Sequence, residues 1–217
     1  MELRRRPAHV GRMASFADRN RSVKTIRQRW SAGRIEFVAV RPILTFDHPV
    51  LREKAKKVAR VDASVQRLID DLTETMLDAP GAGLAANQIG VPLRVCVVKG
   101  DDNQIWGLVN PEIVKMDGTQ VGYEGCLSYP GWVGEVTRAE TVVVKGRNRR
   151  GKEVRIKSTG FTARAFQHEL DHLDGVLFTD KLTSIDTLRR VEELVAEAES
   201  EEAEEKKEDA ERTLVPS

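Results

Sequence analysis

The segment QHELDHLDG, residues 167–175, decides how the rest of this chain is interpreted. An α-helix turns by about 100° per residue, so the side chains of His168 and His172 project from nearly the same face. Two imidazoles in that arrangement can bind one metal ion. Glu169 follows the first of them, where its carboxylate can reach a metal-bound water without being a ligand. The segment therefore predicts a helix with a hydrolytic metal site and Glu169 as its base.

A catalytic site of this type needs about three protein ligands and one open position. Cys126 is the best candidate for the third ligand, because Gly125 removes side-chain bulk beside it and a polar loop can bring its thiolate to the helix. Cys96 lies in the apolar run LRVCVVK (93–99), which is typical of a buried strand. We therefore interpret Cys96 as a core thiol.

Attack on a carbonyl creates an oxyanion, and the glycine-rich segment GAGLAANQIG (81–90) offers a donor for it. The side-chain amide of Gln88 can donate a hydrogen bond, and the backbone N–H of Leu127, next to Cys126, is a second candidate. A loop that joins a helix to a strand, with Gln88 in solvent, is the alternative interpretation of the same segment.

Apolar residues share a face of the predicted helix with the metal ligands. Phe161, Ala165, His168 and His172 are spaced i, i+4, i+7 and i+11. The two apolar side chains either wall a pocket for an unbranched apolar side chain of the substrate or belong to the core, since helical apolar stripes usually mean packing.

The 217 residues are enough for one domain with a sizeable core. Asp62 is a candidate cap for a helix with an apolar stripe, which Pro80 and Gly81 end. The stripe consists of Val65, Leu68, Ile69, Leu72 and Met76. From Leu93 to Lys157 the pattern is typical of β-strands joined by short turns. These strands are LRVCVVK (93–99), IWGLVN (105–110), EIVKM (112–116), TVVVKGRN (141–148) and EVRIKS (153–158).

One helix before the strands and two after them predict an α+β fold. We expect mainly antiparallel sheets packed around the central metal-binding helix at 161–174, with an N-terminal helix on one side and a C-terminal helix that begins near Ser184.

The two ends of the chain carry opposite charge. Residues 1–41 hold eleven Lys or Arg and three acids, whereas residues 191–212 are rich in Glu. We expect a basic, disordered extension at 1–38, a catalytic domain at 39–183, and a C-terminal helix with an acidic tail at 184–217. Three origins are open for the extension: a transit peptide, a nucleic-acid-binding arm, or an upstream start codon.

No apolar run approaches the roughly 20 residues that span a bilayer, and the N-terminus lacks the apolar core of a secretory signal. Two cysteines in such different surroundings favour free thiols in a reducing compartment. We expect a cytoplasmic protein of bacterial type without membrane contact, or an organellar one if the extension is a transit peptide.

Three segments, GAGLAANQ (81–88), EGCLS (124–128) and QHELDH (167–172), resemble in type and order the signature motifs of the peptide deformylase family. The resemblance covers the chain from about Val38 to Leu182 and leaves both ends uncovered. It implies a metal-dependent hydrolase that removes the formyl group from the N-terminal N-formylmethionine of newly synthesised proteins and releases formate.

The resemblance also implies the roles of individual residues. One Fe2+ per chain, with Zn2+, Ni2+ or Co2+ as alternatives, would be held by Cys126, His168 and His172. Glu169 would act as general base and then as acid, and Gln88 with the N–H of Leu127 would stabilise the oxyanion. The N-formylmethionyl nascent polypeptide would lie extended near Gly83 and Gly125. Its methionine would lie against Phe161 and Ala165.

Two other functions fit part of the sequence. An HExxH metallopeptidase shares the helix motif, but such enzymes usually take their third ligand downstream, whereas Cys126 lies upstream. A catalytically silent metal-binding module would need neither Glu169 nor Gln88. The resemblance requires no direct contact with nucleic acid. It leaves open a transient contact with the ribosome. A contact through the C-terminal helix is disfavoured, because that helix is acidic.

Overall fold

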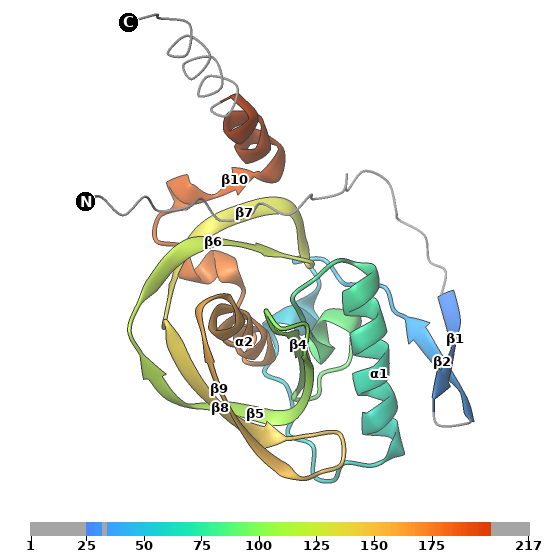
Figure 1. Ribbon diagram of the computed structural model, residues 1–217. Helices are drawn as coiled ribbons and strands as arrows, with labels where there is room; N and C mark the ends of the chain where they lie inside the picture. The colour runs from blue at the N-terminus through green and yellow to red at the C-terminus, as the bar shows by residue number, and fades with distance from the viewer. Residues whose placement is uncertain (1–24, 32–33, 201–217) are drawn as a thin grey trace, which may run out of the picture.

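Helix α2 (Gly160–Leu173) lies at the centre of the molecule, and strands of two sheets curve around it (Figure 1). The computed structural model describes residues 25–31 and 34–200. Every strand pair in its sheets is antiparallel. The predicted α+β fold with antiparallel sheets around the motif helix is confirmed. Within the described ranges, none of the helices has the length and apolarity needed to cross a bilayer.

The larger sheet has five strands in the order β3-β4-β5-β8-β9 and separates α2 from α1 (Ala63–Asp78). Its strands are β3 (Gly83–Ala85), β4 (Val95–Lys99), β5 (Ile105–Asp117), β8 (Thr141–Arg147) and β9 (Glu153–Thr159). In β4, Val95 and Val97 pack in the cluster of α1, and Cys96 and Val98 pack in the cluster of α2. Because helices cover both faces, β4 is a continuous apolar run in the sequence.

Helix α1 forms as its sequence predicts. Oδ1 of Asp62 accepts hydrogen bonds from the backbone N–H groups of Ser64 (2.8 Å) and Val65 (3.1 Å), so it caps the first turn. The five residues of the predicted apolar stripe are all buried against the sheet. The apolar face of α1 therefore forms one of the two cores.

The smaller sheet contains β6 (Gln120–Cys126), β7 (Tyr129–Arg138) and β10 (Arg189–Arg190), in the order β10-β7-β6. Cys126 is the last residue of β6 and pairs with Tyr129 across a tight turn. The expectation that Cys126 lies in a polar loop is wrong: the glycines of this segment belong to a strand, so the position of the thiol is fixed by β-sheet hydrogen bonds.

The segments expected as two strands, at 105–110 and 112–116, form the single strand β5. The pairing of β5 with β8 shifts register between Val109 and Glu112. Asn110 lies there with a φ of 52°, a left-handed conformation that Asn tolerates, and Pro111 follows it. Pro111 therefore marks a bulge, and the strand continues beyond it.

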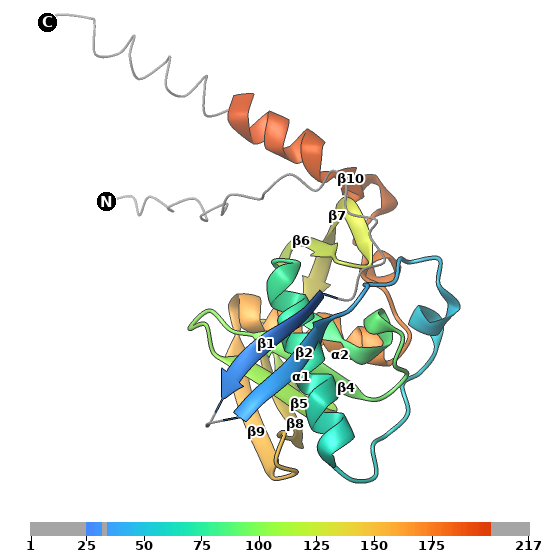
Figure 2. The same ribbon diagram turned by 90° about the vertical axis from the view of Figure 1, so that its right-hand side faces the viewer.

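Part of the N-terminal region that was expected to be disordered forms a hairpin. Strands β1 (Thr25–Ser31) and β2 (Arg34–Val40) pair along their whole length and lie beside α1 (Figure 2). The end of β2 is attached to α1, because the N–H of Ala39 donates to Oδ1 of Asp71 at 3.1 Å. The expectation of disorder is therefore wrong for residues 25–31 and 34–38. Residues 1–24 and 201–217 lie outside the described ranges, and the division of the chain into three regions stays a prediction.

The C-terminal helix begins at Val191 and not near Ser184. Ser184 instead caps a single 3₁₀ turn, Ile185–Thr187, by accepting from the N–H of Asp186 at 3.2 Å. Arg189 and Arg190 then pair with Val133 and Trp132 of β7. Pairing with a sheet edge delays the helix, which is a tertiary effect that a local helix pattern does not reveal.

Candidate metal centre

Three ligand atoms meet between β6 and α2. The Sγ of Cys126 and one nitrogen each of His168 and His172 lie within 4.8 Å of one another. Nε2 of His172 is 3.2 Å from the Cys126 Sγ and 3.2 Å from Nε2 of His168. A thiol and two imidazoles are a ligand set that Zn2+ and several first-row transition metals accept, so these residues fit the predicted metal.

The electrostatics of the cluster favour the metal-binding form of Cys126. Burial opposes a charge on the sulfur, but the imidazole of His172 and a hydrogen bond from His168 hold the pKa of the Cys126 thiol well below its ordinary value. Since the thiolate is the form that binds metals, the site stabilises the ligand it needs. Burial in the core has the opposite effect on Cys96, because it raises the pKa of that thiol, as expected for a packing residue.

A buried carboxylate that the sequence analysis missed supports His168. Oε2 of Glu124 is 2.9 Å from Nδ1 of His168, which leaves Nε2 for the metal. Arg138 binds both carboxylate oxygens of Glu124, at 2.8 and 3.0 Å, and Arg164 binds Oε1 at 2.9 Å. Burial opposes ionisation, but hydrogen bonds from Arg138 and His168 keep the pKa of Glu124 far below its usual value. The available signal was strand alternation, because residues 124 and 126 of β6 share a face.

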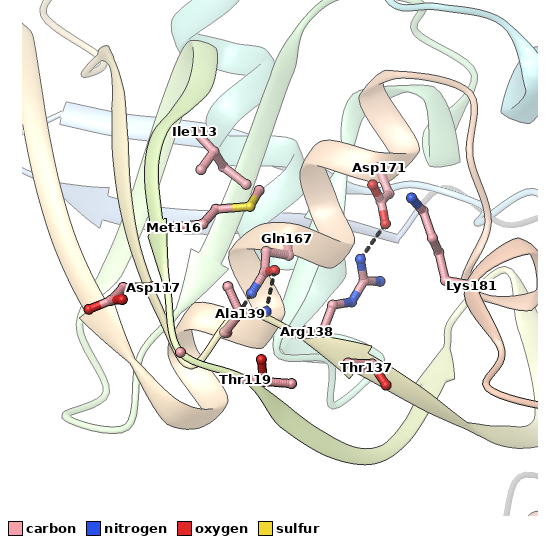
Figure 3. A pocket seen from close by; sticks show the side chains of 11 residues that line it. Ile113, Met116, Asp117, Thr119, Thr137, Arg138, Ala139, Gln167, Asp171 and Lys181 are labelled. Carbon is pink, nitrogen blue, oxygen red and sulfur yellow. Dashed lines mark hydrogen bonds and ion pairs between the residues drawn. The ribbon is translucent and has the colours of Figure 1, made fainter.

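Arg138 also borders a cavity. Its guanidinium pairs with Asp171 at the edge of a cavity of about 580 Å³ (Figure 3). Ile113 and Met116 lie across this cavity from Arg138, and Lys181 lies at its rim. None of the three metal-ligand residues lines the cavity. The metal ligands therefore do not open onto this cavity. The ion pair with Asp171 fixes the Arg138 guanidinium that also binds Glu124.

Gln88 is aimed at the metal cluster. Its Oε1 accepts from the backbone N–H of Ala85 at 2.8 Å, which fixes the orientation of the carboxamide. Its Nε2 donates to Oγ of Ser128 at 3.1 Å and lies 3.7 Å from the Sγ of Cys126. Gln88 lies in the 3₁₀ helix Ala86–Ile89 and is 1% exposed. The alternative interpretation, a solvated Gln88 in a connecting loop, is therefore wrong.

Glu169 is buried beside the cluster and holds a free oxygen. Its Oε2 has no hydrogen-bond partner among the described residues, and burial raises the pKa of its carboxyl to about 7. Its Oε1 lies against Gly83, where an added Cβ would be only 2.4 Å away. Gly83 is therefore needed for the close approach of β3 to this carboxylate.

The remaining candidate residues have different surroundings. Leu127 lies in the turn after Cys126, and its side chain packs on the α1 core. A Cβ on Gly125 would lie 3.2 Å from Val133, so this glycine allows close packing between β6 and β7. Ala165 belongs to the core cluster around α2. Phe161, in the first turn of α2, is 55% exposed and is therefore not part of that core.

A thiolate and two imidazoles at one point leave room for water or substrate on the ion that they bind, and a buried acid stands beside them. A metal-activated water with a carboxylate beside it is an arrangement that serves hydrolysis. The chain is a metal-dependent hydrolase, and similarity to known proteins specifies which kind.

The polypeptide deformylase family model matches residues 40–188. The peptide deformylase of Dehalococcoides mccartyi (strain CBDB1) is 53% identical over 155 residues, which are 71% of this chain and 93% of that protein. Peptide deformylase 1 of Bacillus subtilis (strain 168) is 49% identical over 147 residues, covering 67% of this chain and 92% of that protein. The crystal structure of a peptide deformylase from Legionella pneumophila is 47% identical with a TM-score of 0.65, covering 68% of this chain and 88% of that one. The chain belongs to the peptide deformylase family.

Proposed function

We propose that this chain hydrolyses the formyl group from the N-terminal N-formylmethionine of nascent polypeptides and releases formate. The observation that carries the proposal is the placement of Gln88 and Glu169 around one Cys-His-His cluster. A purely structural metal site needs neither a fixed amide donor nor a buried acid. Membership of the family supports the choice of substrate.

The metal would be held by Cys126, His168 and His172. When bound, such an ion makes water a stronger acid and polarises a carbonyl oxygen. We propose Fe2+ as the ion used, as the family resemblance implies. Zn2+, Ni2+ or Co2+ could occupy the same ligands, because the mixed sulfur and nitrogen set accepts all four ions.

Glu169 would move the proton of the reaction. Its Oε2 is buried and unpaired among the described residues, so it is available to a water molecule beside the cluster. In the first step the carboxylate takes a proton from the attacking water as the new C–O bond forms at the formyl carbon. In the second step it gives that proton to the leaving amine as the C–N bond breaks. Formate and a free N-terminus result.

Gln88 and Leu127 would stabilise the negative charge that develops on the formyl oxygen. The Gln88 amide is already fixed with Nε2 toward Cys126, so it needs little reorganisation during the reaction. The backbone N–H of Leu127 follows Cys126 directly in the chain and is the second donor. Each such donor is worth roughly 10² to 10³ in rate.

We propose that the peptide lies extended between Gly83 and Gly125. The methionine side chain would lie along α2, with the exposed ring of Phe161 and the small side chain of Ala165 on its wall. The cytoplasm is the proposed place of action, since nascent chains carry the substrate there. A transient contact with the ribosome is part of the proposal, through a surface other than the acidic C-terminal helix.

Formate release tests this function against the metallopeptidase alternative. Metal-loaded, full-length protein is incubated with formyl-Met-Ala-Ser and, separately, with casein. We expect formate from the first and no cleavage of the second. Casein cleavage without formate release would reject the proposal.

Gly83→Ala tests the close approach of β3 to the catalytic acid. The new Cβ would collide with Oε1 of Glu169, so the carboxylate must move. A displacement of this size at the reacting centre is expected to lower kcat/KM by about 100-fold while metal content stays at the parental level. Val121→Ala is the control, because the side chain of Val121 is 58% exposed and its truncation is expected to be nearly neutral. If Gly83→Ala turned over normally, Glu169 would not be placed as described.

A further inference from the structure

The two histidines of the metal cluster differ in what holds their second ring nitrogen. Nδ1 of His168 is paired with Glu124, whereas Nδ1 of His172 is buried and has no hydrogen-bond partner among the described residues. Both rings present Nε2 to the cluster, so the proton of each neutral ring belongs on Nδ1. A buried N–H of this kind needs an acceptor, and ligand histidines almost always have one.

Asn87, which contacts His172, carries a buried acceptor. It is fully buried, and its Nδ2 donates to the backbone carbonyl oxygen of His172 at 2.5 Å. That bond fixes which way the carboxamide faces, because Oδ1 in the same place would be repelled by the carbonyl oxygen. Oδ1 of Asn87 is buried and also lacks a partner within the described part of the chain. Two residues in contact, His172 and Asn87, therefore each have a buried polar atom without a partner: the donor Nδ1 of His172 and the acceptor Oδ1 of Asn87.

We propose that Asn87 is a positioning residue for the metal: its Oδ1 accepts the Nδ1 proton of His172 in the loaded site and thereby holds Nε2 toward the ion. The inference rests on the metal site of the proposed function. His168 is then supported by a charged carboxylate from β6, and His172 by a neutral amide from the segment that also carries Gln88. The 3₁₀ helix Ala86–Ile89 would link metal binding to the donor that faces the oxyanion.

The test measures Zn2+ binding to the full chain by competition with a chelator. Asn87→Ala is expected to bind Zn2+ about 10- to 100-fold more weakly than the parent. Asn110→Ala is the matched control, because the Asn110 side chain bridges the backbone N–H and C=O of Val58 (both 2.8 Å) and not a metal-ligand residue. The control should lower the thermal midpoint and leave Zn2+ affinity unchanged. Equal affinity in Asn87→Ala and the parent would overturn the proposal.

A second measurement needs no variant. In the Zn2+-loaded parent, NMR of nitrogen-15-labelled histidines should show His172 protonated at Nδ1, with that proton protected from exchange with solvent. A His172 ring that binds through Nδ1, or an Nδ1 proton that exchanges as fast as that of a free imidazole, would overturn the inference. These outcomes can be distinguished from a failure of the proposed function, which would appear as a metal-loaded parent protein that releases no formate.

Discussion

The α1 side of the molecule and the β6–β7 side are held together in different ways. α1 packs on the five-stranded sheet mainly through apolar side chains. β6 and β7 contact α2 through buried charges, with Glu124 between Arg138 and Arg164. Apolar contacts are non-directional and give way gradually, whereas a buried charge requires each of its partners. The metal ligands all lie on the charged side.

The largest expected effect comes from breaking the charged side. Glu124→Ala leaves two guanidinium groups buried without their shared carboxylate and removes the partner of His168. We expect a loss of about 3–5 kcal/mol in the free energy of unfolding together with weaker metal binding. Denaturant titration and chelator competition measure the two effects.

An exposed ion pair provides the control for Glu124→Ala. Lys57 and Glu112 pair at 2.8 Å with both side chains largely exposed. Lys57→Ala should change the free energy of unfolding by less than about 1 kcal/mol and leave metal binding unaltered. Equal losses in the free energy of unfolding of the two variants would show that burial does not make the Glu124 network more important for stability than an exposed ion pair.

The next effect comes from the apolar side. Leu72 is fully buried in the α1 cluster, so Leu72→Ala should lower the free energy of unfolding by roughly 3 kcal/mol through lost burial and a cavity. Metal affinity measured on the folded variant should equal that of the parent, because Leu72 belongs to the hydrophobic cluster of α1 and not to that of α2. A loss of metal affinity as large as in Glu124→Ala would mean that the two sides are not independent.

The smallest effect concerns the end of α1. Asp62→Ala removes the acceptor for two N–H groups of the first turn and should cost about 1 kcal/mol in the free energy of unfolding. Asp62→Asn retains an acceptor and should lose only part of this. Thermal unfolding of both variants measures the difference. An unchanged midpoint in Asp62→Ala would show that the cap does not stabilise α1.

The apolar side was predictable from sequence. The stripe on α1 and the cap at Asp62 depend on residues within a few positions of one another, so local patterns reveal them. The end of α2 before Gly175, although it lies on the charged side, was predictable for the same reason. Gly175 has a φ of 78° and lies so close to the backbone of Arg52 that a Cβ would be 2.6 Å from its carbonyl oxygen, so a glycine stop is required there.

The charged side was only partly predictable. The HExxH spacing and the chemistry of Cys126 identified the ligand types without any structure. The partners of Glu124 are 14, 40 and 44 residues away in the chain, and their pairing is decided by tertiary packing. Hairpin β1–β2 was hidden in a similar way, because a basic composition outweighed its strand pattern. Local patterns thus reveal what binds the metal, but not what holds the ligands.

In the proposed mechanism, Glu169 moves protons beside a metal that other residues hold. Measuring metal content and formate release on the same preparation of Glu169→Ala tests this role. We predict parental metal content and a rate lower by about 10³-fold, within the 10² to 10⁴ expected for a general base. A variant that contains metal and releases formate at the parental rate would contradict the account.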